Sequence, residues 1–208
     1  MATAIRLGSL YVVASQDFGH RVARFLAEEF PGSRETGADD LASAFTGDAT
    51  AIVVVVPRPA WALCERADQW AYEHGRPWLP VVMEHPVLRV GPLVCPPSGP
   101  CFKCYRARRF QHDTEYAASA VLNAAYDLDA ALSPTGYLPH HARLAAAVAT
   151  QFLTNAETGV VFAFDVLSGR IGAHRVISCH DCEREQHSGD PHLPFDLAGI
   201  TMSAAVRS

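Results

Sequence analysis

The sequence predicts an α/β protein: a mostly parallel sheet with helices on both faces, followed by a C-terminal β-hairpin. Three patterns carry this prediction. An unbroken, β-branched run at 51–57 is typical of a parallel strand buried on both faces. A strand–turn–helix unit of the Rossmann sort precedes it at 5–30. Residues 159–177 indicate two strands around a Leu-Ser-Gly-Arg turn.

The elements follow in order from apolar periodicity and from turn residues. Residues 5–14 read as a buried strand, and 18–30 as an amphipathic helix that Pro31 and Gly32 end. In the helix at 61–74, Gly75 is the expected C-terminal cap and His74 has a structural role. The other expected elements are a short helical piece at 41–45, strands at 79–84 and 87–94, helices at 114–132 and 142–154, and strands at 159–166 and 171–177.

Composition is that of a soluble globular chain of one substantial domain. The 208 residues are 49% hydrophobic and 19% charged, with a net charge of −5. This charge argues against a nucleic-acid-binding protein of the usual basic kind. No apolar run reaches membrane-spanning length, and the first residues lack a signal pattern, so we expect neither a nucleic-acid nor a membrane partner and a cytoplasmic location.

The turn after the first strand reads Ala14-Ser-Gln-Asp-Phe-Gly19. A nucleotide site of the Rossmann type needs a glycine-rich turn, so that the backbone approaches phosphate at the helix N-terminus. Only one glycine is present here, and Asp17 places negative charge where phosphate would lie. We therefore expect no ATP to bind this chain and no cofactor-binding residues.

Two Cys-x-x-Cys pairs are the strongest chemical signal in the chain. Cys101 and Cys104 form the first pair, and Cys179 and Cys182 form the second. Two such pairs match a structural zinc ion held by four thiolates. Binding would close the chain between the pairs into a loop and couple site assembly to folding.

Other readings of the four cysteines stay open at this point. The four cysteines could instead be two reduced, partly buried pairs. They could form a disulfide framework, although the chain shows no secretory signal. They could also bind a catalytic zinc ion, although such an ion usually keeps an open coordination position. His180 lies within the second pair and could replace one thiolate.

No catalytic residue is predicted elsewhere. Cys64 and Cys95 are expected to be small buried hydrophobes, and His140 and His141 point apart on a helix without a carboxylate at ligand spacing. The basic residues that follow the first pair are expected to balance the negative charge of a four-thiolate site, with an acidic peptide or partner as the second reading. They are Lys103, Arg106, Arg108 and Arg109.

The order of these features resembles a known family. Gly75-Arg-Pro-Trp78-Leu-Pro80 and Val90-Gly-Pro-Leu-Val94 lead into Cys101-Phe-Lys-Cys104, and His174-Arg-Val-Ile is followed by Cys179-His-Asp-Cys182. From Ile5 to Cys182 the chain resembles the ThiF-like proteins of azoline-forming ribosomal peptide clusters. These are relatives of ubiquitin-activating enzymes that work beside a YcaO-family cyclodehydratase.

The resemblance implies a degenerate Rossmann-like, ThiF-type sheet and a supporting role. In the family, the ThiF-like protein recruits the precursor peptide and presents it to the YcaO partner. That partner uses ATP to activate backbone amides, and the cysteine pairs of the ThiF-like protein hold structural zinc. Many members carry an N-terminal winged-helix-like peptide-binding domain, which is expected to be missing here because the first strand begins almost at Met1.

Three functional hypotheses follow. The favoured one is a zinc-containing scaffold, not catalytic by itself, that binds a precursor peptide, a YcaO-type enzyme or both. The alternatives are an ATP-dependent adenylating enzyme that acts on a peptide or carrier-protein carboxylate, and a zinc-stabilised domain unrelated to peptide modification. We expect one ThiF-like domain at 1–182, an apolar-spaced tail at 183–208, and a possible homodimer formed through the tail or the sheet edges.

Overall fold

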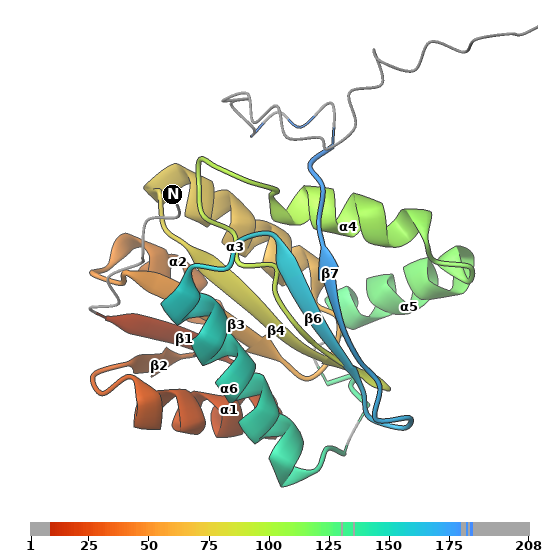
Figure 1. Ribbon diagram of the computed structural model, residues 1–208, viewed down its shortest axis with the longest axis horizontal. Coiled ribbons are helices and arrows are strands. Elements are labelled where there is room, and N and C mark those ends of the chain that lie inside the picture. The colour runs from red at the N-terminus through yellow and green to blue at the C-terminus, as the bar shows by residue number, and fades with distance from the viewer. Residues whose placement is uncertain (1–8, 130, 135, 180–181, 183, 185–208) are drawn as a thin grey trace, which may run out of the picture.

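A computed structural model describes residues 9–129, 131–134, 136–179, 182 and 184. Their centre is a mixed, seven-stranded sheet in the order β2-β1-β3-β4-β5-β6-β7. Figure 1 shows the sheet crossing the molecule, with β2 and β7 at its two ends. The chain is thus a mixed α/β protein, as its patterns predict. The expected tail at 183–208 lies outside the described residues except for Arg184.

The first half of the sheet is parallel. Its strands are β1 (Leu10–Ala14), β2 (Arg34–Thr36), β3 (Ala51–Val56) and β4 (Trp78–Glu84). Each neighbouring pair runs in the same direction, with β1 between β2 and β3. Every residue of β3 is buried, because helices cover both faces of a central parallel strand.

The second half is antiparallel and comes from two hairpins. β5 (Val87–Val90) turns back on β4 after His85 and Pro86. β6 (Val160–Asp165) pairs with β5, and β7 (Ile171–Arg175) pairs with β6. The expected C-terminal hairpin is therefore present, and the long connection between β5 and β6 carries three helices.

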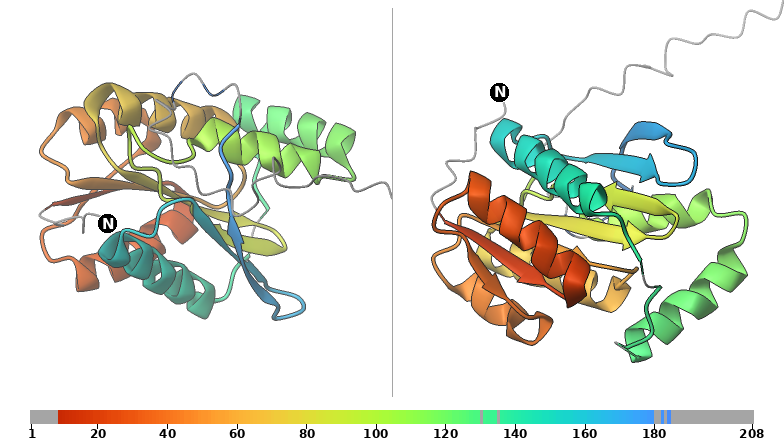
Figure 2. Two further views of the ribbon diagram at one scale, coloured as in Figure 1. Left: turned by 45° about the horizontal axis from the view of Figure 1, so that its top comes forward. Right: turned by 90° about the horizontal axis from the view of Figure 1, so that it is seen from below.

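Helices cover both faces, as Figure 2 shows. α1 (Gln16–Glu29) and α6 (Pro139–Asn155) pack on one face. α2 (Leu41–Thr46), preceded by a 3-10 turn at Ala38–Asp40, shares the other with α3 (Trp61–His74) and the start of α4 (Phe102–Gln111). α5 (Tyr116–Leu128) follows α4 and contacts α3. Among the described residues, no helix is both long and apolar enough to cross a membrane.

Alternation in the strands divides the apolar side chains between two cores. Val12, Val53 and Val55 face α1 and α6, whereas Val13, Ile52 and Val54 face α2 and α3. This arrangement places α4, which begins at the first cysteine pair, on the same side of the sheet as α2 and α3.

Two elements escaped the sequence analysis. β2 is a three-residue edge strand with no buried residue, so it has no apolar pattern. α4 follows the first cysteine pair and buries only Phe102 and Cys104, because basic residues occupy most of its surface. The expected strand at 87–94 ends at Val90; Val94 still makes a short bridge to Trp78.

Gly91 follows β5 at a point of close backbone contact. Its φ is +98°, and a Cβ there would lie 2.4 Å from the Val160 carbonyl oxygen and 3.1 Å from the Phe152 ring. We predict that Gly91→Ala lowers the free energy of unfolding by at least about 2–4 kcal/mol, because a left-handed backbone and a backbone clash both act against it.

The matched control is Gly169→Ala in the turn of the last hairpin. Gly169 also has a positive φ, +71°, but nothing lies within 4 Å of the added Cβ. Its cost should be about 1 kcal/mol, from conformation alone. Urea denaturation of both variants measures the difference, and equal losses would contradict the packing argument.

Candidate metal centre

The first cysteine pair lies at the N-terminus of α4. Cys101 is the residue before the helix, with extended backbone angles, and Cys104 lies in the first turn. The proline-rich loop before it is tightened by a hydrogen bond from the Ser98 N–H to the Cys95 carbonyl oxygen, 3.0 Å. Both Cys101 and Cys104 are buried. The spacing of two residues therefore places two thiols on one turn, as expected.

The second pair reaches the first from the end of the last hairpin. The Sγ atom of Cys182 lies 3.5 Å from that of Cys101, which is 3.6 Å from that of Cys104. The Cys179 backbone N–H donates to the Cys104 Sγ atom at 3.3 Å. Three of the four predicted ligands thus form one cluster, and Cys179 lies directly beside it.

The geometry of the cluster fits a metal ion. The Sγ atoms of Cys101, Cys104 and Cys182 all lie within 4.8 Å of one another. For zinc–sulfur bonds of about 2.3 Å, tetrahedral geometry separates two sulfur atoms by about 3.8 Å. The observed separations of 3.5 and 3.6 Å are close to that value. These three cysteines could therefore bind a metal. Cys179 is not one of this group of three, although its backbone N–H contacts the Cys104 sulfur atom. His180 lies outside the described residues.

The sulfur atoms also change one another's acidity. The hydrogen bond with Cys101 lowers the pKa of Cys104, and the same contact raises the pKa of Cys101. Burial raises the pKa of Cys179. The lowered pKa of Cys104 favours its thiolate, which is the form that binds metals.

A buried carboxylate joins the two cysteine pairs to the core. Asp68 on α3 has an exposed side-chain fraction of 1%. Its Oδ1 atom accepts hydrogen bonds from the Phe102 N–H at 3.1 Å and from the Trp78 indole at 3.4 Å, and its Oδ2 atom forms an ion pair with Arg184. Burial raises the pKa of Asp68 against these partners. Asp68 thus fixes one residue of each cysteine segment.

Arg108 on α4 holds the segment that leads from β7 to Cys179. Its guanidinium donates to the Ile177 and Ser178 carbonyl oxygens, both at 3.2 Å. The other basic residues of the helix differ in their partners: Arg106 forms an ion pair with Glu65, and Arg109 with Glu84. The basic cluster seen in the sequence is thus largely engaged within the fold.

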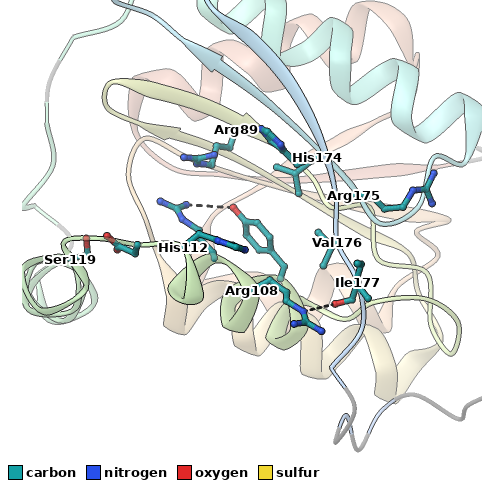
Figure 3. Close-up of a pocket in the computed structure, with 12 residues that line it drawn as sticks. Arg89, Arg108, His112, Ser119, His174, Arg175, Val176 and Ile177 are labelled. Atoms are coloured by element: carbon teal, nitrogen blue, oxygen red, sulfur yellow. Dashed lines mark hydrogen bonds between the residues drawn. The ribbon is translucent and has the colours of Figure 1, made fainter. Parts of the chain in front are cut away.

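A groove of about 780 Å³ lies beside the cysteine cluster, between α4 and the β5–β7 end of the sheet. Figure 3 shows His112 and Arg108 on the α4 side, and Arg89 and His174 on the sheet side. Val161, Val176 and Tyr105 supply apolar wall. The groove was not predicted from the sequence, because its residues come from five elements, β5, α4, α5, β6 and β7; only the basic run in α4 pointed to it.

The turn between β1 and α1 carries an acidic group at the helix N-terminus. The Asp17 carboxylate accepts a hydrogen bond from the Tyr137 hydroxyl and lies 3.8 Å from Arg21. A cavity of about 330 Å³ lies at this end of β1 and β3, and its charged lining residues are Asp39, Asp127, Arg58 and Arg66. Two carboxylates and two guanidinium groups thus lie where a Rossmann fold would hold a nucleotide.

The other cysteines and histidines that the sequence analysis singled out pack within the fold. Cys64 is buried in α3, and burial raises its pKa; Cys95 is half-buried, and burial raises its pKa to about 11. His74 stacks on Trp70. His140 and His141 do not point apart as expected, because their ring centroids lie 4.4 Å apart in an edge-to-face contact. His141 is buried, its Nδ1 atom accepts a hydrogen bond from the Leu138 N–H, and burial lowers its pKa.

Comparisons with solved structures place the fold. The heterocyclase TruD matches with a TM-score of 0.60 and 20% identity over 85% of this chain. A chain of the E. coli microcin synthetase McbBCD complex matches with a TM-score of 0.63 and 11% identity over 86% of this chain. E. coli MccB in complex with MccA matches with a TM-score of 0.58 and 10% identity over 87% of this chain. The chain spans 26% of the TruD chain, 69% of the McbBCD chain and 67% of MccB. No family model and no curated protein matches the sequence.

These identities are low, so what they establish is the shared fold. The chain has the fold found in a heterocyclase and in a microcin synthetase, which agrees with the kind of protein that its motifs resemble.

We predict about one zinc ion per chain in protein purified without chelator. Cys104→Ser and Cys182→Ser should each abolish it, because each removes a sulfur atom from the cluster, and Cys179→Ser should do the same. Cys95→Ser is the control, since Cys95 is a free cysteine outside the cluster. Mass spectrometry of the metal content measures the loss; if variants are insoluble, chelation of the wild-type protein should lower its melting temperature. Full zinc content in the serine variants would contradict the assignment.

We also predict that Asp68→Ala costs about 3–5 kcal/mol of folding stability, since it leaves Arg184 and two N–H donors without their buried acceptor. Asp68→Asn should cost less, because its oxygen atom can still accept from Phe102 and Trp78. Denaturation of the zinc-loaded proteins gives both values. A loss within about 0.5 kcal/mol of wild type for Asp68→Ala would show that Asp68 does not hold the two segments.

Proposed function

We propose that this protein is a zinc-containing, ThiF-like scaffold subunit, not catalytic by itself, that presents a ribosomal precursor peptide to a YcaO-type cyclodehydratase. The observation that carries the proposal is the fold shared with a heterocyclase and with a microcin synthetase chain. The two cysteine pairs that the sequence has in common with ThiF-like partner proteins converge in this fold.

The first support for a binding role is the β1–α1 turn. An adenylating enzyme must stabilise the negative charge of ATP phosphates, usually with backbone N–H groups at a helix N-terminus. Here Asp17 occupies the first turn of α1, and its carboxylate is engaged by Tyr137. Negative charge at that position opposes phosphate binding.

The second support is the surface of α5. Tyr126 is the one buried residue among the thirteen of this helix, and Asp127 is its one charged residue. Val121 and Leu128, seven residues apart and on one face, have exposed fractions of 73% and 89%. An exposed apolar strip of this kind marks a protein-interaction surface. In the proposed assembly, α5 contacts the cyclodehydratase partner.

The proposed zinc ion has a structural role. Four thiolates leave no open position for substrate, and the fold around them depends on the cross-link. In this assignment Cys101, Cys104, Cys179 and Cys182 hold the ion between α4 and the last hairpin.

The direct test is reconstitution of this chain with a YcaO-type enzyme and the precursor peptide of that enzyme. We predict that adding this chain, in the presence of ATP, strongly accelerates the loss of one water per azoline ring, read by mass spectrometry. The isolated chain should show no ATP binding in calorimetry. Equal azoline formation without the chain would contradict the scaffold role, and ATP binding by the isolated chain would favour an adenylating enzyme.

The partner surface has its own test. We predict that Val121→Asp combined with Leu128→Asp abolishes co-purification with the YcaO-type enzyme, because the charges must be desolvated at an apolar contact. Leu167→Asp is the matched control, since Leu167 is 83% exposed in the turn of the last hairpin. Co-purification unchanged in the double variant would place the partner elsewhere.

A further inference from the structure

The β7 strand ends the sheet, and its hydrogen-bonding pattern shows which backbone groups face outward. The Val176 N–H donates to the Gly159 carbonyl oxygen, and the Asp165 N–H donates to that of Arg170. In an antiparallel pair such bonds recur at every second residue. The N–H and C=O groups of Gly172 and His174 therefore point to β6, and those of Ile171, Ala173 and Arg175 point away from the sheet.

The outward row is interrupted at one end. The next outward carbonyl group, that of Ile177, accepts a hydrogen bond from Arg108. The three outward-facing residues of β7 are Ile171, Ala173 and Arg175. Within the described part of the chain, no backbone hydrogen bond joins their outward N–H and C=O groups to another segment. β7 thus presents a short, unpaired edge that begins beside the groove and ends at Arg108.

Side chains on this edge alternate between two environments. His174 and Val176 face the same side as Val161, which packs with Cys101 and Cys104 next to α4. They therefore face the groove. By strand alternation Ile171, Ala173, Arg175 and Ile177 face the opposite side, where Ile171 and Ile177 are 67% and 59% exposed. Arg175 and Ile177 also border the groove, which runs along this edge. Figure 3 shows the Arg175 side chain pointing away from the groove.

Both environments carry positive charge, although the whole chain has a net charge of −5. Arg89 and Arg109 line the groove and share the carboxylate of Glu84 beside it. Arg108 also lines the groove and donates to the Ile177 and Ser178 carbonyl oxygens. Asp113 is the one carboxylate among the described residues that line the groove. On the outer side, none of the ion pairs formed by the described residues includes Arg175.

We propose that the β7 edge binds an extended, acidic peptide segment, which adds to the sheet as an eighth strand. Outward N–H and C=O groups would bind its backbone. Its side chains would alternate, with one set entering the groove toward Arg108 and His174 and the other lying over Ile171 and Arg175. Acidic side chains suit the set in the groove, because Arg89, Arg108 and Arg109 outnumber the carboxylates of Glu84 and Asp113 there. They also suit the other set, because Arg175 is in none of the ion pairs formed by the described residues.

The inference rests on the proposed function for the source of the segment, which would be the precursor peptide. The chemistry of the segment comes from the edge itself. A small anion would use convergent donors, whereas β7 offers a linear row of alternating donors and acceptors that matches a peptide backbone.

The test is fluorescence anisotropy with defined, labelled peptides of about ten residues, enough to span β7. The probe is a Glu-Val repeat. A Lys-Val repeat tests charge, and a Glu-Val repeat with N-methyl groups on alternate residues tests backbone pairing. We expect the first to bind, and the other two to bind at least about tenfold more weakly. Equal binding of all three, or no binding, would overturn the proposal; in the second case the charges serve only to protect the edge from aggregation.

The matched variants are Ala173→Pro and Ala173→Val. The Ala173 N–H points outward, so proline removes a donor from the edge and none from the sheet, where edge positions tolerate proline. We expect Ala173→Pro to lower the affinity for the Glu-Val peptide at least about tenfold and Ala173→Val to preserve it. The circular dichroism spectrum should be unchanged in both variants. Equal probe binding by the two variants would overturn backbone pairing.

Light scattering tests whether a second copy of this chain, and not a peptide, occupies the β7 edge. A dimer that Ala173→Pro dissociates, together with no probe binding, would overturn the peptide assignment. The reconstituted reaction distinguishes the two proposals. If the Glu-Val probe binds but this chain does not accelerate azoline formation, the proposed function fails and the docking edge stands. If acceleration persists in Ala173→Pro and no probe binds, the docking edge fails and the proposed function stands.

Discussion

The buried Asp68 carboxylate is the interaction on which the C-terminal part of the structure depends. It lies on α3, in the helix layer beside the parallel half of the sheet, and binds the Phe102 backbone and Arg184. A buried charge is tolerated only when its partners are in place, and removal of a partner is strongly destabilising. Asp68 therefore requires both cysteine segments to be docked at once. The proposed zinc ion would strengthen the same junction, because three of its four ligands lie within two residues of Phe102 or of Arg184, which both bind Asp68.

This junction explains the division of labour in the fold. The parallel half, with β3 buried throughout, is a rigid base. The antiparallel half carries features suited to binding: the groove, the β7 edge and the approach to the second cysteine pair. Arg108 joins α4 to the end of the last hairpin, because its guanidinium reaches from α4 to the backbone just before Cys179. The proposed zinc ion would fix the β7 edge relative to α4 and so define the groove. In the proposed function the ion would shape a binding surface and take no part in chemistry.

Much of the fold follows from local patterns. The helix expected at 61–74 has the same bounds as α3, and the β-branched run forms β3 within one residue of its expected end. β2 and α4 were missed because neither has an apolar repeat that stands out from its polar residues. In α5 the spacing of Val121 and Leu128 correctly indicated a helix, but spacing cannot say whether another part of the same chain covers that face. The cysteine spacing predicted a cluster, whereas Asp68 and the β7 edge depend on register and on contacts between distant segments.

The most direct test of the central claim is X-ray absorption at the zinc edge of the purified protein. A structural cross-link that shapes a binding surface requires a closed coordination sphere. The account predicts four sulfur neighbours at about 2.3 Å and no oxygen or nitrogen neighbour. Three or fewer sulfur atoms with a bound water would mean an open position suited to catalysis. That result would contradict a protein that acts by binding alone.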